Sequence, residues 1–68
     1  MKMSDPHVQH IQITLGMALN AIADEYHKRE DIAQHFTAWV NAQAMDNRKY
    51  TVVYIDSARR LFDRRFPA

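Results

Sequence analysis

The chain has 68 residues, of which 47% are hydrophobic and 25% charged, with a formal net charge of +1, one glycine and no cysteine. This length allows one domain, residues 1–68, and the composition is typical of a folded soluble chain. The missing cysteine excludes disulfides, thiolate metal sites and a cysteine nucleophile. No apolar run reaches the roughly 20 residues that a membrane span needs, and the first fifteen residues do not resemble a secretory signal. We therefore expect a cytoplasmic protein that does not enter a membrane.

The small size limits how such a domain becomes stable. A domain of this length buries only about 60% of the surface that its unfolded chain exposes. Natural domains this small usually gain stability from disulfides, a metal or a partner subunit. Because this chain cannot form disulfides, we expect it to self-associate or to dock on a partner.

The first predicted helix covers residues 6–28. Asp5 can cap its free N–H groups, and Pro6 suits the first helical position because proline has no N–H to leave unbonded. Apolar residues then recur with the helical period of about 3.6 residues and form one face. These core candidates are Val8, Ile11, Leu15, Ala18, Leu19, Ile22 and Tyr26.

The second predicted helix covers residues 31–45 and follows a run of charged residues at 27–31. Glu30 or Asp31 can cap it, and acidic side chains suit the positive end of a helix. Its core candidates are Ile32, Phe36, Trp39, Val40 and Gln43, with Ala33 at the edge.

The third predicted helix covers residues 47–65. Asp46 or Asn47 can cap it, and asparagine can also adopt the left-handed conformation that glycine usually supplies at a turn. Val52 and Val53 fall on its polar side and can extend an exposed patch. The core candidates are Tyr50, Tyr54, Ile55, Ala58, Leu61, Phe62 and Phe66.

Residues 50–55 also have high β-propensity, which leaves a second architecture open. A single strand here would have to pair with another chain, giving two helices and a swapped strand at 50–55. The segregation of apolar and charged residues in this segment favours a helix. The sequence therefore predicts an all-α, three-helix domain, completed as a homodimer.

The segment from Ile32 to Met45 contains no charged residue. Because the centres of protein interfaces are depleted in charge, its outward side is a candidate interface with a protein partner or a second copy. The alternatives are a helix at the centre of the bundle and a helix that is neutral by chance. The candidate interface residues are Gln34, Thr37, Ala38, Asn41 and Met45.

The first helix carries a second apolar stripe outside its core face, formed by Ile13, Met17 and Ala21 and flanked by Gly16 and Asn20. A glycine inside a helix costs about 1 kcal/mol relative to alanine, a cost that close approach of another backbone would explain. We predict that this stripe is a homodimer contact. The alternative is a few scattered, exposed apolar residues, which are common on protein surfaces.

Charge is distributed unevenly along the chain. Residues 1–31 hold three basic and five acidic groups, net −2, and residues 32–68 hold six basic and three acidic groups, net +3. A basic third helix repeated by two-fold symmetry can meet successive DNA grooves. The candidate nucleic-acid contacts are Arg48, Lys49, Arg59, Arg60, Arg64 and Arg65.

Two structural explanations compete with nucleic-acid binding. Arg64 and Arg65 stand where the C-terminal end of a helix attracts cations. Aspartates one turn away from Arg59 and Arg60 can neutralise those two residues locally.

Histidines provide the only candidate metal ligands with suitable spacing. His27, Asp31 and His35 recur every four residues and would suit zinc or nickel only if one helix ran through the charged junction. His7 and His10 form a second pair. Neither spacing matches a specific metal-binding motif. We expect no metal and no cofactor.

Asp24, Glu25 and His27 are the only candidate acid–base set. Such a set needs a shielded cleft that shifts pKa values, and a chain this short has little volume for a core and a cleft together. The sequence also lacks a glycine-rich phosphate loop and a nucleophile elbow. We therefore expect no enzymatic activity.

These features favour a small non-enzymatic regulator or inhibitor that docks neutral and apolar helix faces on a larger protein. The alternative is a dimeric nucleic-acid-binding regulator that uses the basic third helix. Salt separates the two, because phosphate binding weakens steeply as salt rises, whereas burial of neutral helix faces hardly changes.

Overall fold

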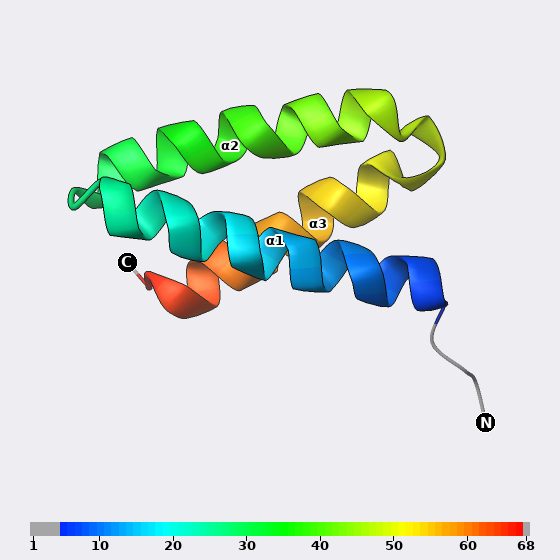
Figure 1. The fold of residues 1–68 in the computed structure, drawn as a ribbon, viewed down its shortest axis with the longest axis horizontal. Coiled ribbons are helices and arrows are strands. Elements are labelled where there is room, and N and C mark those ends of the chain that lie inside the picture. Colours follow the sequence, from blue (N-terminus) through cyan, green and yellow to red (C-terminus); the bar gives the residue numbers. More distant parts are fainter. Residues whose placement is uncertain (1–4, 68) are drawn as a thin grey trace.

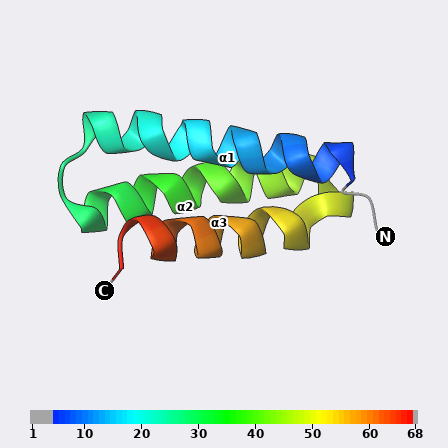
Figure 2. The same cartoon turned by 90° about the horizontal axis from the view of Figure 1, so that it is seen from below.

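The computed structural model describes residues 5–67, so residues 1–4 and 68 of the predicted domain lie outside the described part. The described chain forms α1 (Pro6–Glu25), α2 (Arg29–Asp46), a 3-10 turn η1 (Arg48–Tyr50) and α3 (Thr51–Arg65). α2 runs back along α1 and α3 runs back along α2 (Figure 1). All three helices lie roughly along the long axis of the bundle (Figure 2). Each helix packs against the other two. The predicted all-α, three-helix fold is confirmed, and the swapped strand at 50–55 is wrong because these residues are helical.

α1 begins as predicted but ends three residues early. The Asp5 carboxylate accepts a hydrogen bond from the N–H of His7 at 2.9 Å, and Pro6 occupies the first turn. The helix ends because Tyr26 adopts an extended backbone conformation, with φ −115° and ψ 136°. Its ring stacks on that of His35 in α2, with centroids 4.0 Å apart, so a contact between helices accompanies the end of α1.

α2 begins at Arg29, two residues before the predicted start, and ends at Asp46. Its N-cap is Lys28, whose side chain makes no capping hydrogen bond. The predicted capping role of Glu30 or Asp31 is therefore wrong. Both residues lie in the first turn, where their carboxylates still stabilise the positive end of the helix.

The turn between α2 and α3 forms without a left-handed residue. Asn47 has a φ of −127°, and no residue in the described chain has a positive φ, so the predicted left-handed turn is wrong. The Asn47 amide instead donates to the carbonyl of Gln43 at 3.0 Å. The Thr51 hydroxyl lies within donating distance of the carbonyls of Ala44 (3.2 Å) and Arg48 (3.0 Å). These side chains add a second hydrogen bond to carbonyls that already accept a backbone N–H, and so tie the turn to the end of α2.

One side chain links the start of α2 to the end of α3. The Arg29 Nε–H donates to the carbonyl of Phe66 at 3.2 Å, and the guanidinium lies 5.3 Å from the centroid of the Phe62 ring. A cation at this end of α3 is also favourable for the helix dipole.

The core consists of nine buried side chains: Ile11, Leu15, Leu19, Ile32, Phe36, Val40, Ala44, Tyr54 and Ala58. All but Ala44 were among the predicted core residues. Ile55 was also predicted to be in the core, but it is 48% exposed. The buried side of α3 is centred on Tyr54 and Ala58, and Ile55 lies at its edge, beside a groove shared with α2.

Candidate functional site

An open groove of about 320 Å³ lies between α2 and α3. Its floor is apolar, because buried Phe36, Val40 and Ala58 form it together with the half-buried Phe62. Exposed side chains from both helices stand at its rims. The α2–α3 groove is lined by Ala33, Phe36, Thr37, Val40, Asn41, Ile55, Ala58, Arg59, Phe62 and Asp63.

The two rims of the α2–α3 groove differ in charge. Thr37 and Asn41 form the α2 rim and are neutral, whereas Arg59 and Asp63 form the α3 rim. Although they stand one helical turn apart, Arg59 and Asp63 are not among the ion pairs found within residues 5–67. Their charges therefore remain open to a docking partner.

Exposed apolar surface continues from the groove onto α3. A shallower hollow, lined by Val52, Ile55 and Arg59 among others, shares Ile55 and Arg59 with the groove. Val52 is 77% exposed. Of the two valines predicted to extend an exposed patch, Val52 does so, whereas Val53 packs against the core.

The sequence pattern does not predict the α2–α3 groove, because the residues of its floor follow the periodicity of the core. A face pattern on one helix does not reveal how far apart two neighbouring helices lie. The available signal was Ala58, a small residue at a core position of α3. A small side chain there leaves space above the floor of the groove, beside the rings of Phe36 and Phe62, which stack with centroids 6.3 Å apart.

The predicted neutral interface on α2 is divided between two places. Thr37 and Asn41 line the groove. Gln34, Ala38 and Met45 are also exposed but do not line it, and Met45 is 76% exposed. Only one edge of the predicted interface, formed by Thr37 and Asn41, therefore belongs to the groove.

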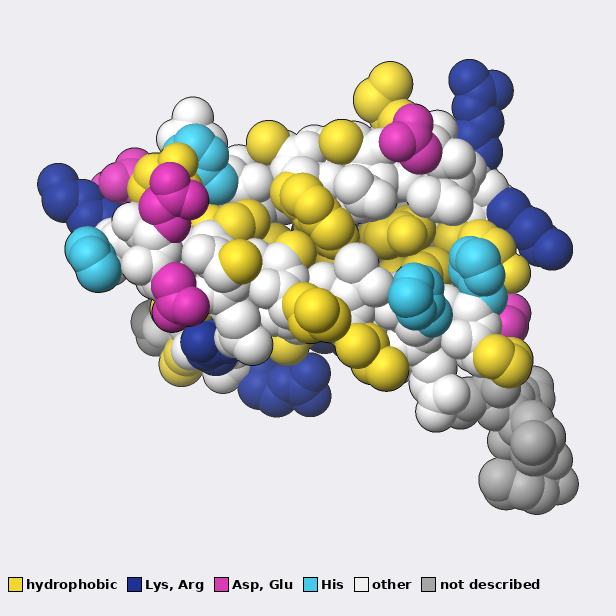
Figure 3. Space-filling view, viewed as in Figure 1, with side chains coloured by type: hydrophobic (Ala, Val, Ile, Leu, Met, Phe, Trp, Pro, Cys, Tyr) yellow, Lys and Arg dark blue, Asp and Glu magenta, His cyan; other side chains and the backbone are white. Residues whose placement is uncertain are grey.

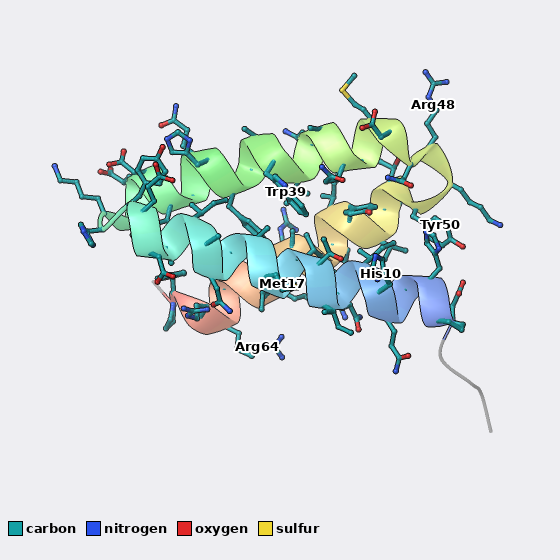
Figure 4. The ribbon with its side chains drawn as sticks, in the orientation of Figure 1. His10, Met17, Trp39, Arg48, Tyr50 and Arg64 are labelled. Atoms are coloured by element: carbon teal, nitrogen blue, oxygen red, sulfur yellow. The ribbon has the colours of Figure 1, made fainter. Side chains whose placement is uncertain are left out.

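The predicted stripe on α1 is exposed. Ile13 is 62% and Met17 67% exposed, and Ala21 is exposed beside them. Figure 3 shows hydrophobic side chains on this outer surface of α1, apart from those in the seam between α1 and α2, and Figure 4 labels Met17 near the middle of the helix. A Cβ added to Gly16 would meet no atom within 4 Å, so no contact within the described chain explains this glycine.

The predicted nucleic-acid contacts do not form one cluster. Arg48 and Lys49 lie in η1, and the other four lie on α3, with Arg64 and Arg65 in its last turn. Figure 4 shows Arg48 at the turn that follows α2, at the upper right, and Arg64 on the lower side of the bundle, well apart from it.

Some of these basic side chains are bound within the chain. Arg60 forms an ion pair with Asp56 at 3.2 Å, as the sequence spacing predicted. Arg65 donates a hydrogen bond to Asn20 of α1. Arg60 and Arg64 also line a polar groove between α1 and α3, of about 330 Å³.

The histidines fall in two regions, with His7 and His10 one turn apart on α1 and His27 and His35 before and within α2. His27 falls between α1 and α2, so the continuous helix needed to align His27, Asp31 and His35 does not exist. Within residues 5–67 no three acidic, histidine or cysteine side chains come close enough to hold a metal ion. His7 stacks on Tyr50 at 4.4 Å, as His35 stacks on Tyr26, so two histidines contribute to packing between elements.

Comparisons of the chain with protein-family models, with curated proteins and with solved structures found no match. None of the helices in the described part combines the length and apolar character that crossing a membrane requires. What the protein binds must therefore be inferred from its surfaces.

Proposed function

We propose that this chain is a small protein-binding regulator or inhibitor that acts by docking on a larger protein and carries out no bond chemistry. The observation that supports this most directly is the α2–α3 groove, which opens to solvent above an apolar floor and has the exposed Ile55 at its edge. Grooves of this kind accept the apolar face of a partner's amphipathic helix. By binding this helix, the regulator would either cover a surface that the partner needs or hold the partner in one conformation.

The rims of the groove define the chemistry of the partner helix. Its apolar residues would cover Phe36, Ile55 and Phe62, and its neutral side would pass Thr37 and Asn41 on α2. An acidic side chain near Arg59 and a basic one near Asp63 would complement the α3 rim. Complementary charges of this kind increase specificity and the rate of association more than they increase affinity.

We also propose that the chain forms a homodimer through the α1 stripe, defined as Ile13, Met17 and Ala21 with the flanking Gly16. Its exposed apolar side chains and the internal glycine support this contact. No residue of α1 lines the α2–α3 groove, so dimerisation along α1 leaves the groove open in both copies.

Affinity capture with matched variants tests the groove. Immobilised wild type, I55D and M45D are incubated with nuclease-treated lysate of the cells that produce the protein, and retained proteins are identified by mass spectrometry. Ile55 and Met45 are both exposed, so neither change should unfold the bundle, and circular dichroism checks this. We expect a protein retained in stoichiometric amount by wild type and M45D and lost with I55D. Retention by I55D and loss with M45D would assign binding to the outer side of α2 instead.

Nucleic-acid binding is the competing outcome of the same experiment. It has one supporting observation, the two arginines, Arg60 and Arg64, that share the polar groove between α1 and α3. Recovery of nucleic acid from an untreated lysate, weakened by moderate salt and abolished in R60E/R64E, would overturn the protein-binding proposal. Protein capture that is unchanged in R60E/R64E and insensitive to salt would support it.

A further inference from the structure

Resting on the proposed homodimer, we infer that two copies pair through α1 in an antiparallel arrangement whose two-fold axis passes beside Met17. The occupant of the exposed face of α1 is thus a second copy of this chain. The pattern of side chains along that face, the hydrogen-bonding groups at its two ends and the position of Gly16 support this arrangement.

The exposed face of α1 is longer than the apolar stripe alone. At about 100° per residue, His10 and Asp24 lie on the same side of the helix as Ile13, Met17 and Ala21. All five side chains are exposed. Met17 lies at the midpoint of this face, with a histidine at one end and an aspartate at the other.

An antiparallel partner makes this face complementary to itself. With the axis at Met17, residues equally distant from it face each other across the interface. Ile13 then meets the partner's Ala21, so that a large side chain fills the space beside a small one. His10 meets the partner's Asp24, and an imidazole N–H can donate to that carboxylate. Every such contact occurs twice.

Other arrangements lose the pairing of His10 with the partner's Asp24. A parallel pair would place Asp24 against the partner's Asp24, and like charges in contact are destabilising. Moving the antiparallel axis to residue 15 would place Asp24 opposite the partner's Pro6, which has no N–H to donate. Neither His10 nor Asp24 forms an ion pair within residues 5–67, so both are free to pair across an interface.

Gly16 lies one residue from the proposed axis. Because a Cβ there would meet nothing within 4 Å, this glycine is not required by packing in its own chain. Without a side chain at this point, two helices can approach toward the short end of the usual range of interaxial distances, about 8–10 Å. At about 100° per residue, Gly16 lies at the flank of this face, about 100° around the helix from Met17, so its missing side chain removes bulk beside the point of closest approach.

Cysteine cross-linking tests the arrangement, because the natural chain has no cysteine. Under mild oxidation M17C should form a disulfide with itself. I13C should not, because its two copies would be offset by about 12 Å along the axis, beyond the roughly 7 Å between Cα atoms that a disulfide allows. Mixed I13C and A21C should form a disulfide with each other. V52C, an exposed site on α3, is the control and should stay reduced.

A charge swap gives an independent test. H10D should raise the dimer dissociation constant about tenfold, because it places two carboxylates together at both ends of the interface. The double variant H10D/D24K should restore the wild-type constant, since opposite charges then face each other. Failure of the second change to rescue the first would overturn the proposed pairing.

Sedimentation of the wild type tests the homodimer separately from its antiparallel arrangement. A mass that remains at 8.0 kDa at high micromolar concentration would overturn the homodimer itself. A dimer in which I13C and M17C each cross-link with themselves would be parallel, and one in which mixed I13C and M17C cross-link would have its axis at residue 15. Either result would overturn the proposed arrangement and leave the homodimer standing.

Discussion

Replacing Gly16 with alanine should have opposite effects on folding and on dimerisation. In the interior of an exposed helix, glycine is less favourable than alanine by about 1 kcal/mol. Beyond the backbone of its own helical turns and its two neighbours in sequence, the added Cβ would meet nothing within 4 Å, so it neither clashes nor gains contacts with the rest of the chain, and the helix propensity alone sets the effect on the monomer. We expect G16A to raise the free energy of unfolding by about 0.5–1 kcal/mol.

Thermal unfolding measures this effect if dimerisation is removed first. The double variant G16A/M17D is therefore compared with M17D, in which the α1 stripe is disrupted. For a domain of this size, 1 kcal/mol corresponds to a rise in Tm of about 4–8 °C. A42G, at an exposed site inside α2, is the matched control and should lower Tm by a similar amount. A lower Tm for G16A would refute the open space that the structure places beside Gly16.

The same substitution in the wild-type background addresses the interface. If two backbones approach closely at Gly16, the new methyl group separates them, and G16A should weaken the dimer although it stabilises the monomer. Sedimentation equilibrium gives the dissociation constant. A dimer of unchanged strength would show that no second backbone lies near Gly16, and would remove that part of the reasoning for the antiparallel arrangement.

Three further substitutions test the fold by chemical denaturation. L19A removes a side chain that is fully buried and should cost about 2–5 kcal/mol, and a loss below about 1 kcal/mol would contradict its place in the core. R29A removes the hydrogen bond to the Phe66 carbonyl and should cost about 1 kcal/mol. R48A, which removes no such bond between α2 and the end of α3, is its control and should be nearly neutral. D5A removes the N-cap of α1 and should also cost about 1 kcal/mol, and an unchanged midpoint would show that the cap contributes nothing.

The number and type of the helices follow from local features of the sequence. The helical period and the Asp5–Pro6 start signal act within a few residues, so they were sufficient to predict α1 and its buried face. The end of α1 was not predictable in this way. Tyr26 continues the apolar period, but its ring stacks on His35 of the next helix, a contact that depends on the packing of α1 against α2.

The turn between α2 and α3 shows another limit of the sequence pattern. The sequence predicted that Asp46 or Asn47 would cap the third helix, or that Asn47 would adopt a left-handed conformation, whereas the Asn47 side chain donates to the Gln43 carbonyl of α2. Thr51 complements it from the start of the next helix. Such hydrogen bonds between neighbouring elements depend on where the chain re-enters the bundle, which the residue pattern does not specify.

The candidate surfaces differ in the same way. The α1 stripe belongs to one helix, and a helical wheel was therefore enough to predict its exposure. The α2–α3 groove belongs to two helices, and its depth depends on their separation. Ile55 is an example. It belongs to the apolar face of α3 that was predicted to be buried, but it lies at the edge of the groove because of the distance between the two helices.

Because the two proposed surfaces share no residue, their functions should be separable. M17D should abolish dimerisation and retain one groove in each chain, so a partner helix should still bind every chain with the same intrinsic affinity. I55D should abolish groove binding and leave the dimer intact. The dimer should bind an immobilised partner more tightly than M17D does, since two linked sites gain in effective concentration when both can engage. Isothermal titration of each variant with the captured partner measures the intrinsic affinity. Loss of groove binding in a folded M17D variant would show that the α1 contact is itself part of the partner site.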